Sequence, residues 1–352
     1  MRTHYFSKGT HVTDLLDSTY YKHLLKLRND VSIACDTYFQ KLNAVKVDLY
    51  LITQSVSSPM GKGSDSKPIP FAFGKEKAYL VDSAQFGLEP LVQKSYKIAY
   101  CYLPSFRGEN PDYRHLNQFY HCEAEMRGTN KDVIKLVNGL VDHLIITIIN
   151  GLKKERYMFK EHKEGKTDYL VFKELEYVIG KKYPILTFDE AFQLLKKHGF
   201  ENLVDETSFG RILSREGECK ITELVSNNKL PVWVTNYDRD TIAFYQKPDP
   251  KNKESVLNAD LLFPPLNGGF CGEIVGSGQR QDSATELAKS IKRQGITHYN
   301  NYDWYIDLRN RKDYKTTSGF GLGIERFIAW SLGLSSIADA ITYPVLKDTN
   351  IL

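Results

Sequence analysis

The chain has 352 residues, of which 41% are hydrophobic and 26% are charged, and its formal net charge is +4. A chain of this length forms one large domain or two ordinary ones and can bury a substantial core. The net charge is too small for this length to indicate nucleic-acid binding by itself. Residues 1–16 lack the apolar stretch of a secretory signal, and the longest apolar run, residues 144–149, is too short to span a bilayer. These features predict a cytoplasmic protein without a membrane segment.

The five cysteines are scattered along the chain and show no CxxC spacing. They are Cys35, Cys101, Cys122, Cys219 and Cys271. This pattern is typical of reduced thiols in the core of a cytoplasmic protein rather than of disulfides or a zinc site. We therefore expect free thiols.

Apolar periodicity and capping residues predict the secondary structure. In the first part of the chain we expect a helix over 20–42, followed by strands over 78–83, 97–106 and 116–126. Helices over 130–152 and 187–199 come next, and then strands over 231–237 and 241–247. The last predicted elements are a helix over 282–295 and a strand over 302–309. Thr187 with Glu190, at the start of the helix over 187–199, have the spacing of a capping box. Ser283 with Glu286, at the start of the helix over 282–295, have the same spacing.

Several predicted strands follow one another with gaps of hairpin length. This arrangement favours a largely antiparallel β-sheet flanked by helices, which is an α+β fold rather than a doubly wound one. The glycine-rich stretch 267–278 lacks the GK[ST] ending of a phosphate-binding P-loop and is not followed at once by a helix. The charged block 153–166 is interpreted as a solvated surface segment.

The stretch "FRGENPDYRHLNQF", residues 106–119, joins two predicted antiparallel strands. It would present four charged or titratable side chains at one end of the sheet: Arg107, Glu109, Arg114 and His115. An arginine can fork onto two phosphate oxygens, and the ring of Phe119 can stack on a base. The alternative is an ordinary hairpin with surface ion pairs.

Two later stretches carry complementary groups. Asp260 and Glu273 lie near the ends of consecutive strand-like segments, and paired carboxylates opposite arginines suit Mg²⁺ that bridges a polyphosphate. Residues 318–334, "SGFGLGIERFIAWSLGL", form a glycine-rich strand that turns into a helix bearing Arg326. The alternatives are structural carboxylates, and glycines that serve close packing beside a solvent-exposed arginine.

Taken together, these three stretches resemble the class II aminoacyl-tRNA synthetases, and the asparaginyl and aspartyl enzymes most closely. "FRGE…RHLNQF…EAE" resembles motif 2 and "GFGLGIER" resembles motif 3. The resemblance spans roughly residues 25–345 and implies an N-terminal extension, residues 1–24, before a catalytic domain, residues 25–352, without the OB-fold anticodon-binding domain. It also implies a homodimer, although motif 1 lacks the expected proline near residues 49–50.

The resemblance assigns a role to each matching position. Arg107 would bind the α-phosphate of ATP and the carboxylate being activated, while Glu109 would accept from the adenine amino group and Phe119 would stack on the ring. Arg114, His115 and Arg326 would reach the outer phosphates, and Asp260 with Glu273 would hold Mg²⁺. The implied reaction is attack of a carboxylate on the α-phosphorus, which gives an acyl adenylate and pyrophosphate.

The resemblance also predicts an amino-acid pocket. Its lining would be Ser83, Gln85, Glu89, Glu123 and Arg280. Leu88 and Glu89 follow the asparaginyl pattern, since aspartyl enzymes carry a lysine at the first of these positions. Glu89 beside Arg280 would accept from an amide NH₂ and repel a second carboxylate. Departures from the family pattern include Gln118, Asp238, Gln281 and Thr317.

The resemblance leaves three functions open. One is an AMP-forming ligase that activates asparagine or aspartate. In one version, a synthetase-derived asparagine synthetase, ammonia attacks the aspartyl adenylate. Another delivers activated asparagine to tRNA or to another acceptor. The third is a non-catalytic sensor of tRNA or an amino acid. Retention of the ATP-contacting residues favours an enzyme.

Overall fold

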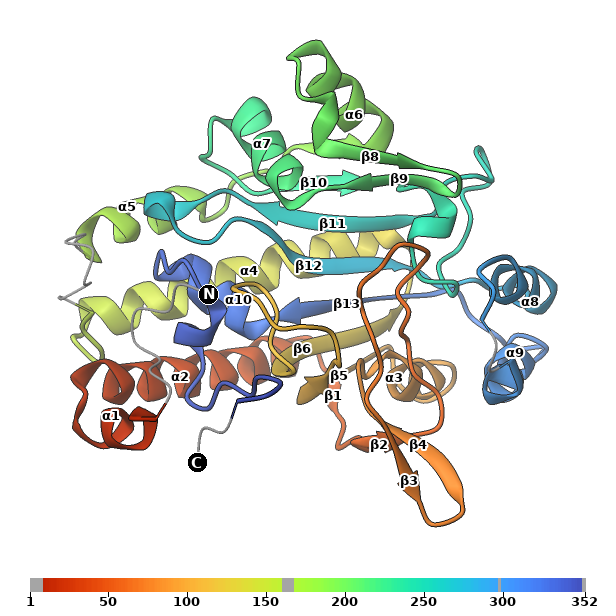
Figure 1. Ribbon diagram of the computed structural model, residues 1–352, viewed down its shortest axis with the longest axis horizontal. Helices are drawn as coiled ribbons and strands as arrows, with labels where there is room; N and C mark the ends of the chain where they lie inside the picture. Colours follow the sequence, from red (N-terminus) through yellow and green to blue (C-terminus); the bar gives the residue numbers. More distant parts are fainter. Residues whose placement is uncertain (1–8, 160–167, 297–298, 350–352) are drawn as a thin grey trace.

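A computed structural model describes residues 9–159, 168–296 and 299–349. Its centre is an eight-stranded sheet in the order β1-β5-β6-β13-β12-β11-β10-β7 (Figure 1). The strands, in that order, are Val45–Lys46, Ile98–Phe106, Gln118–Arg127, Thr317–Gly323, Gly272–Gln279, Asn258–Phe263, Val232–Thr235 and Ile185–Thr187. All neighbours are antiparallel except the two edge pairs, β1 with β5 and β10 with β7. The predicted α+β class with a largely antiparallel sheet is confirmed.

Helices cover one face of this sheet. The long helices α2 (Thr19–Lys41) and α4 (Asn130–Lys153) pack against each other and against the strands, and α10 (Ile324–Ser331) contacts β6 and β13. The amphipathic pattern of α4 explains this position, because Val133, Leu140 and Leu144 are fully buried in the main core. The predicted boundary between residues 24 and 25 falls inside α2.

Smaller elements surround the sheet. The remaining helices are α1 (His11–Asp17), α3 (Gln85–Val92), α5 (Asp168–Val178), α6 (Phe188–Lys197), α7 (Arg215–Ser226), α8 (Ala284–Arg293) and α9 (Asp303–Leu308). Two small sheets are made of β2 (Ile52–Thr53), β4 (Glu76–Leu80) and β3 (Pro70–Phe73), and of β8 (Val204–Thr207) with β9 (Gly210–Leu213). The capping box at Thr187 and Glu190 is present, and Ser283 caps α8. Within the described residues, no helix combines the length and apolarity that a membrane crossing requires.

Two predicted strands are wrong. Thr241 ends a short 3₁₀ turn and residues 242–247 run irregularly, and residues 303–308 form α9 instead of a strand. Both segments are rich in aromatic residues that pack together in one cluster, including Phe244, Tyr245 and Tyr302. Tyr302, Tyr305 and Arg309 are buried at a spacing of three and four residues, which is the helical period that the strand prediction overlooked.

The expectation of free cysteines is also wrong for one pair. Cys219 on α7 and Cys271, just before β12, form a disulfide with Cα atoms 5.7 Å apart. The other three, Cys35, Cys101 and Cys122, are buried free thiols. The two paired cysteines are 52 residues apart in sequence, and only the packing of α7 against β11 and β12 brings them together. Part of the charged block 153–166 lies outside the described residues.

Candidate active site

The open face of the sheet owes its chemistry to the alternation of side chains along β6. Residues 120, 122, 124 and 126 point towards the helices and join the main core or pack against it. The odd-numbered residues of the strand, Phe119, His121, Glu123 and Glu125, lie on the other face. On the neighbouring strand β13, glycines stand opposite His121 and Glu123, so this part of the face carries no competing side chains.

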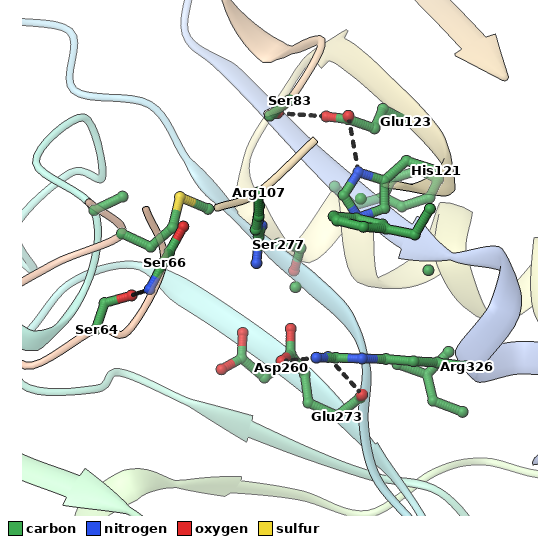
Figure 2. Close-up of a pocket in the computed structure, with 18 of the residues that line it drawn as sticks. Ser64, Ser66, Ser83, Arg107, His121, Glu123, Asp260, Glu273, Ser277 and Arg326 are labelled. Carbon is green, nitrogen blue, oxygen red and sulfur yellow. Dashed lines mark hydrogen bonds and ion pairs between the residues drawn. The ribbon is translucent and has the colours of Figure 1, made fainter. Parts of the chain in front are cut away.

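A cavity of about 330 Å³ opens on this face. Every predicted site residue except Glu89 lines it: Ser83, Gln85, Arg107, Glu109, Arg114, His115, Phe119, Glu123, Asp260, Glu273, Arg280 and Arg326. Figure 2 shows Ser83 and Glu123 at one end and Asp260, Glu273 and Arg326 at the other, with Arg107 seen between the two groups. Residues from distant parts of the chain therefore share one cavity.

At the end of the cavity that holds Asp260 and Glu273, arginines form ion pairs with acidic side chains. Arg326 donates to the carboxylate of Glu273 at 3.1 Å, and Arg114 donates to Glu218 at 2.9 Å. The backbone N–H of Glu273 also donates to Glu218, at 2.9 Å. Glu218 was not among the predicted residues, because it lies on α7 in a part of the chain without a recognisable motif.

The two carboxylates of the predicted metal site share one small space. A Cβ atom added at Gly276 would lie 3.0 Å from Oε1 of Glu273 and 3.7 Å from Oδ1 of Asp260, so the glycine keeps that space open. Burial and the charges of Glu273 and Glu218 raise the pKa of Asp260 well above its usual range. Burial would also raise the pKa of Glu273, but Arg326, Arg114 and Arg107 together lower it.

This arrangement fits a Mg²⁺ ion. The repulsion that raises the pKa of Asp260 is relieved when a divalent cation lies between the carboxylates. Within the described residues, no cluster of three or more His, Cys, Asp or Glu side chains is gathered as a closed metal site. Two carboxylates, completed by phosphate oxygens and water, are the donor set with which Mg²⁺ is usually held.

Arg107 brings a positive charge into the cavity. Its guanidinium carbon lies 5.4 Å from the centre of the Phe119 ring, and its Nε atom is buried without a hydrogen-bond partner. Among the residues that the structure describes, none forms an ion pair with it. A positive group left without a counter-ion in a cavity is a binding point for an anion.

The rest of the motif 2 hairpin is held in place by contacts within it and with the segment that contains Lys67. Glu109 is buried and accepts from the N–H of Lys67 at 3.1 Å. His115 lies 2.9 Å from the carboxylate of Asp112. Burial would raise the pKa of Asp112, but His115 and two backbone N–H groups lower it to about 2. The hairpin therefore has a defined shape before any ligand binds.

The other end of the cavity offers polar groups suited to a small zwitterion. Glu123 accepts from the hydroxyl of Ser83 at 2.6 Å and from the N–H of Ala84 at 2.9 Å. The Nε2 atom of Gln85 is bound to Glu89 and Tyr305, whereas its Oε1 atom is buried without a partner. That oxygen lacks a donor, which an ammonium or an amide of a ligand could supply.

Arg280 lies in the cavity but does not carry a free charge. Its Nε and Nη2 atoms donate to the carboxylate of Glu125, at 3.0 Å for the shorter of the two Nε contacts and at 2.8 Å for Nη2. Burial raises the pKa of Glu125 to about 7, although Arg280 acts in the opposite direction. The Nη1 atom forms no hydrogen bond with any described residue and remains as a donor for a ligand oxygen.

The expected position of Glu89 beside Arg280 is not found. Glu89 is fully buried behind the cavity wall and pairs with Arg309 at 2.6 Å. The hydroxyls of Tyr305 and Tyr314 donate to the same carboxylate. Because Gln85 also binds Glu89, this buried cluster orients Gln85 rather than touching a ligand itself.

His121 was missed by the sequence interpretation. It lines the cavity between Phe119 and Glu123, and its Nδ1 atom lies 3.2 Å from Oε1 of Glu123. The two-residue period of the strand could have identified it, because both of its predicted neighbours point into the site.

An antiparallel sheet with this arginine-bearing hairpin, carboxylate pair and arginine-bearing helix around one cavity defines a ligase of the class II synthetase type. The chain belongs to the family of class II tRNA synthetases: residues 8–347 match the family described as "tRNA synthetases class II (D, K and N)". The predicted resemblance is therefore confirmed at the level of the family.

Named relatives agree with this family. The chain is 32% identical over 332 residues to the asparagine–tRNA ligase of Mycoplasma mycoides, with 91% of the chain and 70% of the relative covered. It is 34% identical over 330 residues to the asparagine–tRNA ligase of Mycoplasmoides gallisepticum, with 91% and 69% covered. Among solved structures, it is similar to the asparaginyl-tRNA synthetase of Pyrococcus horikoshii complexed with asparaginyl-adenylate. That match has a TM-score of 0.79 and 27% identity, and covers 96% of this chain and 73% of the other.

Proposed function

We propose that the protein catalyses ATP-dependent, AMP-forming activation of asparagine or aspartate. The observation that carries this proposal is the unpaired Arg107 in a cavity with the carboxylate pair at one end and the amino-acid groups at the other. A bent nucleotide triphosphate would extend from Phe119 to the acidic end, and the amino acid would occupy the end with Ser83 and Gln85. Asparaginyl-adenylate in the similar Pyrococcus horikoshii structure supports the same reading.

In the proposed reaction, a carboxylate oxygen of the amino acid attacks the α-phosphorus of ATP. An acyl adenylate forms and pyrophosphate leaves. Arg107 would bind both the α-phosphate and the attacking carboxylate, so it brings two anions together and neutralises the developing charge. Arg114, His115 and Arg326 would bind the outer phosphates and stabilise pyrophosphate as it leaves.

Asp260 and Glu273 would hold Mg²⁺ against the phosphates. When bound, the ion withdraws negative charge from the phosphate oxygens of the leaving group. The protein contributes the two carboxylates and, through Arg326 and Arg114, keeps Glu273 ionised to serve as a ligand.

Two acceptors of the acyl group are compatible with this site. We infer that ammonia attacks an aspartyl adenylate formed on the β-carboxylate, with the α-carboxylate of aspartate on the free donor of Arg280. In this pose the α-ammonium lies near Oε1 of Gln85, since Glu89 is not accessible. The second candidate is transfer of activated asparagine to tRNA, which the names of the relatives favour.

The test is ATP–pyrophosphate exchange with each of the twenty amino acids, followed by product analysis. We expect Mg²⁺-dependent exchange with asparagine or aspartate alone. Formation of asparagine from aspartate and ammonia supports the first acceptor, and asparaginyl-tRNA formation supports the second. The absence of exchange with any amino acid would refute the proposal and favour the sensor.

The protein is also proposed to form a homodimer. The helix α2 exposes Leu25 and Ile33, which are 50% and 52% accessible, and the segment 50–52 exposes three further large apolar residues. Large apolar side chains exposed in this number favour association with another chain. Light scattering at micromolar concentration should give twice the mass of the chain, whereas a monomer would contradict this.

A further inference from the structure

A carboxylate–imidazole pair lies at the amino-acid end of the cavity, and its histidine has no role in the activation step described above. His121 on β6 lines the cavity, and its Nδ1 atom contacts Oε1 of Glu123 at 3.2 Å and Oγ of Ser105 at 3.0 Å. Figure 2 shows this contact with Glu123, which in turn is bound to Ser83. Among the described residues, the polar contacts of the imidazole are therefore all made by its Nδ1 atom.

The partners of Nδ1 determine the tautomer of His121. Burial would raise the pKa of Glu123, but His121, Ser83 and the N–H of Ala84 together lower it, so the carboxylate is ionised and only accepts hydrogen bonds. With Nδ1 only 3.2 Å from this acceptor, the tautomer that carries its proton on Nδ1 is favoured. Nε2 is left with a lone pair, and it forms no hydrogen bond with any residue in the described part of the chain.

The imidazole also lies close to the expected position of the reacting acyl group. The ring centres of His121 and Phe119 are 4.8 Å apart, and the guanidinium of Arg107 lies 5.4 Å from the same Phe119 ring. In an acyl adenylate, the acyl carbon is one oxygen away from the α-phosphorus. With the α-phosphate on Arg107 and the amino acid beside Ser83, that carbon would lie on the side of the cavity that His121 lines.

We propose that His121, oriented by Glu123 and Ser105, is the general base that takes a proton from an amine nucleophile attacking the acyl adenylate. As the C–N bond forms, a proton passes from the nitrogen to Nε2, and the C–O bond to AMP breaks with its electron pair on the departing phosphate. The imidazolium then releases its proton to water. This inference rests on the version of the proposed function in which ammonia is the acceptor.

The two half-reactions differ in their need for such a base. The attacking carboxylate of the first step is already ionised and has no proton to lose. Ammonia is present at neutral pH almost entirely as ammonium, and the attacking nitrogen must also lose a proton as the amide forms. A base positioned by a second group contributes about 10²–10⁴-fold to a step that needs proton transfer.

The variant His121→Asn separates these steps. The asparagine amide can still donate to Glu123, but it offers no basic nitrogen. We expect ATP–pyrophosphate exchange within a few-fold of the wild type and a loss of about 10²–10⁴-fold in asparagine formation from ammonia. Hydroxylamine is largely unprotonated at neutral pH and is a stronger nucleophile than ammonia. The rate of hydroxamate formation should therefore fall far less than the rate of asparagine formation. His143→Asn, on α4 at a distance from the cavity lining, is the matched control and should leave all three rates unchanged.

Three results would overturn the inference. If His121→Asn makes asparagine from ammonia at the wild-type rate, His121 is not the base. If exchange, ammonia and hydroxylamine reactions all fall equally, the residue has a structural role. If the wild type exchanges pyrophosphate but never uses ammonia, the ammonia version of the proposed function fails and the inference falls with it, whereas activation itself stands.

Discussion

Replacement of Arg107 by methionine should abolish activation without unfolding the protein. The structure supplies the reason for this separation. Arg107 forms no ion pair with any described residue, so its loss leaves no buried carboxylate without a partner. Removal of a single donor aimed at developing charge costs about 2.7–4 kcal/mol, or about 10²–10³-fold in rate. Because Arg107 would serve both reacting anions, we expect a loss at the upper end of that range.

Arg280→Met is the matched comparison. The side chains of Arg280 and Glu125 are 6% and 1% exposed and are 2.8 Å apart. Breaking such a buried pair leaves an uncompensated carboxylate and costs about 3–5 kcal/mol of folding stability. Urea unfolding should therefore show a large loss for Arg280→Met and almost none for Arg107→Met.

The activity assay is ATP–pyrophosphate exchange at saturating amino acid and Mg²⁺. Substantial exchange by Arg107→Met would refute its assignment to the α-phosphate. A large loss of stability in the same variant would refute the conclusion that the arginine is unpaired.

Three further predictions follow from the buried charges and the disulfide. Glu89→Gln should lower the urea midpoint, since Arg309 loses its partner, and raise KM for the amino acid through Gln85; altered discrimination between asparagine and aspartate at unchanged stability would instead place Glu89 in contact with the substrate. Asp260→Asn should abolish exchange yet stabilise the protein at neutral pH, because burial and two acidic neighbours raise the pKa of Asp260 in the folded state. With a raised folded-state pKa, stability from this group is greatest below its unfolded value and is lost as pH rises, so the gain from the variant should vanish in acid; a gain that persists there would contradict the assignment. Cys219→Ser should cost about 4 kcal/mol if the 52-residue loop acts through chain entropy, and a dithiol reductant should shift the melting temperature of the wild type but not of the variant.

Local patterns were sufficient for much of the fold and for the nucleotide end of the site. The two apolar runs that form β5 and β6, and the charged stretch between them, predicted the hairpin that carries Arg107. The apolar period of α4 and the cap at Thr187 likewise depend on neighbours in sequence, and both predictions are confirmed.

The remainder depends on contacts between distant segments. The partner of Glu89 is Arg309, which is 220 residues away in sequence. No local pattern showed that Glu89 would pair with this arginine instead of lining the cavity. The disulfide and the contact between Arg114 and Glu218 likewise depend on how α7 packs against the sheet. His121 is different, because the alternation of side chains along the strand was sufficient to place it in the site. It was missed because only the positions of known motifs were considered.

The most direct test of the central claim is a crystal structure with Mg²⁺ and a non-hydrolysable ATP analogue. The claim is that the cationic and acidic side chains of this cavity surround a single nucleotide. We predict the α-phosphate on Arg107, the adenine on Phe119, the terminal phosphate near Arg326, and the metal between Asp260 and Glu273. A nucleotide bound elsewhere on the protein, or one that leaves Arg107 and the two carboxylates without contacts, would contradict the account.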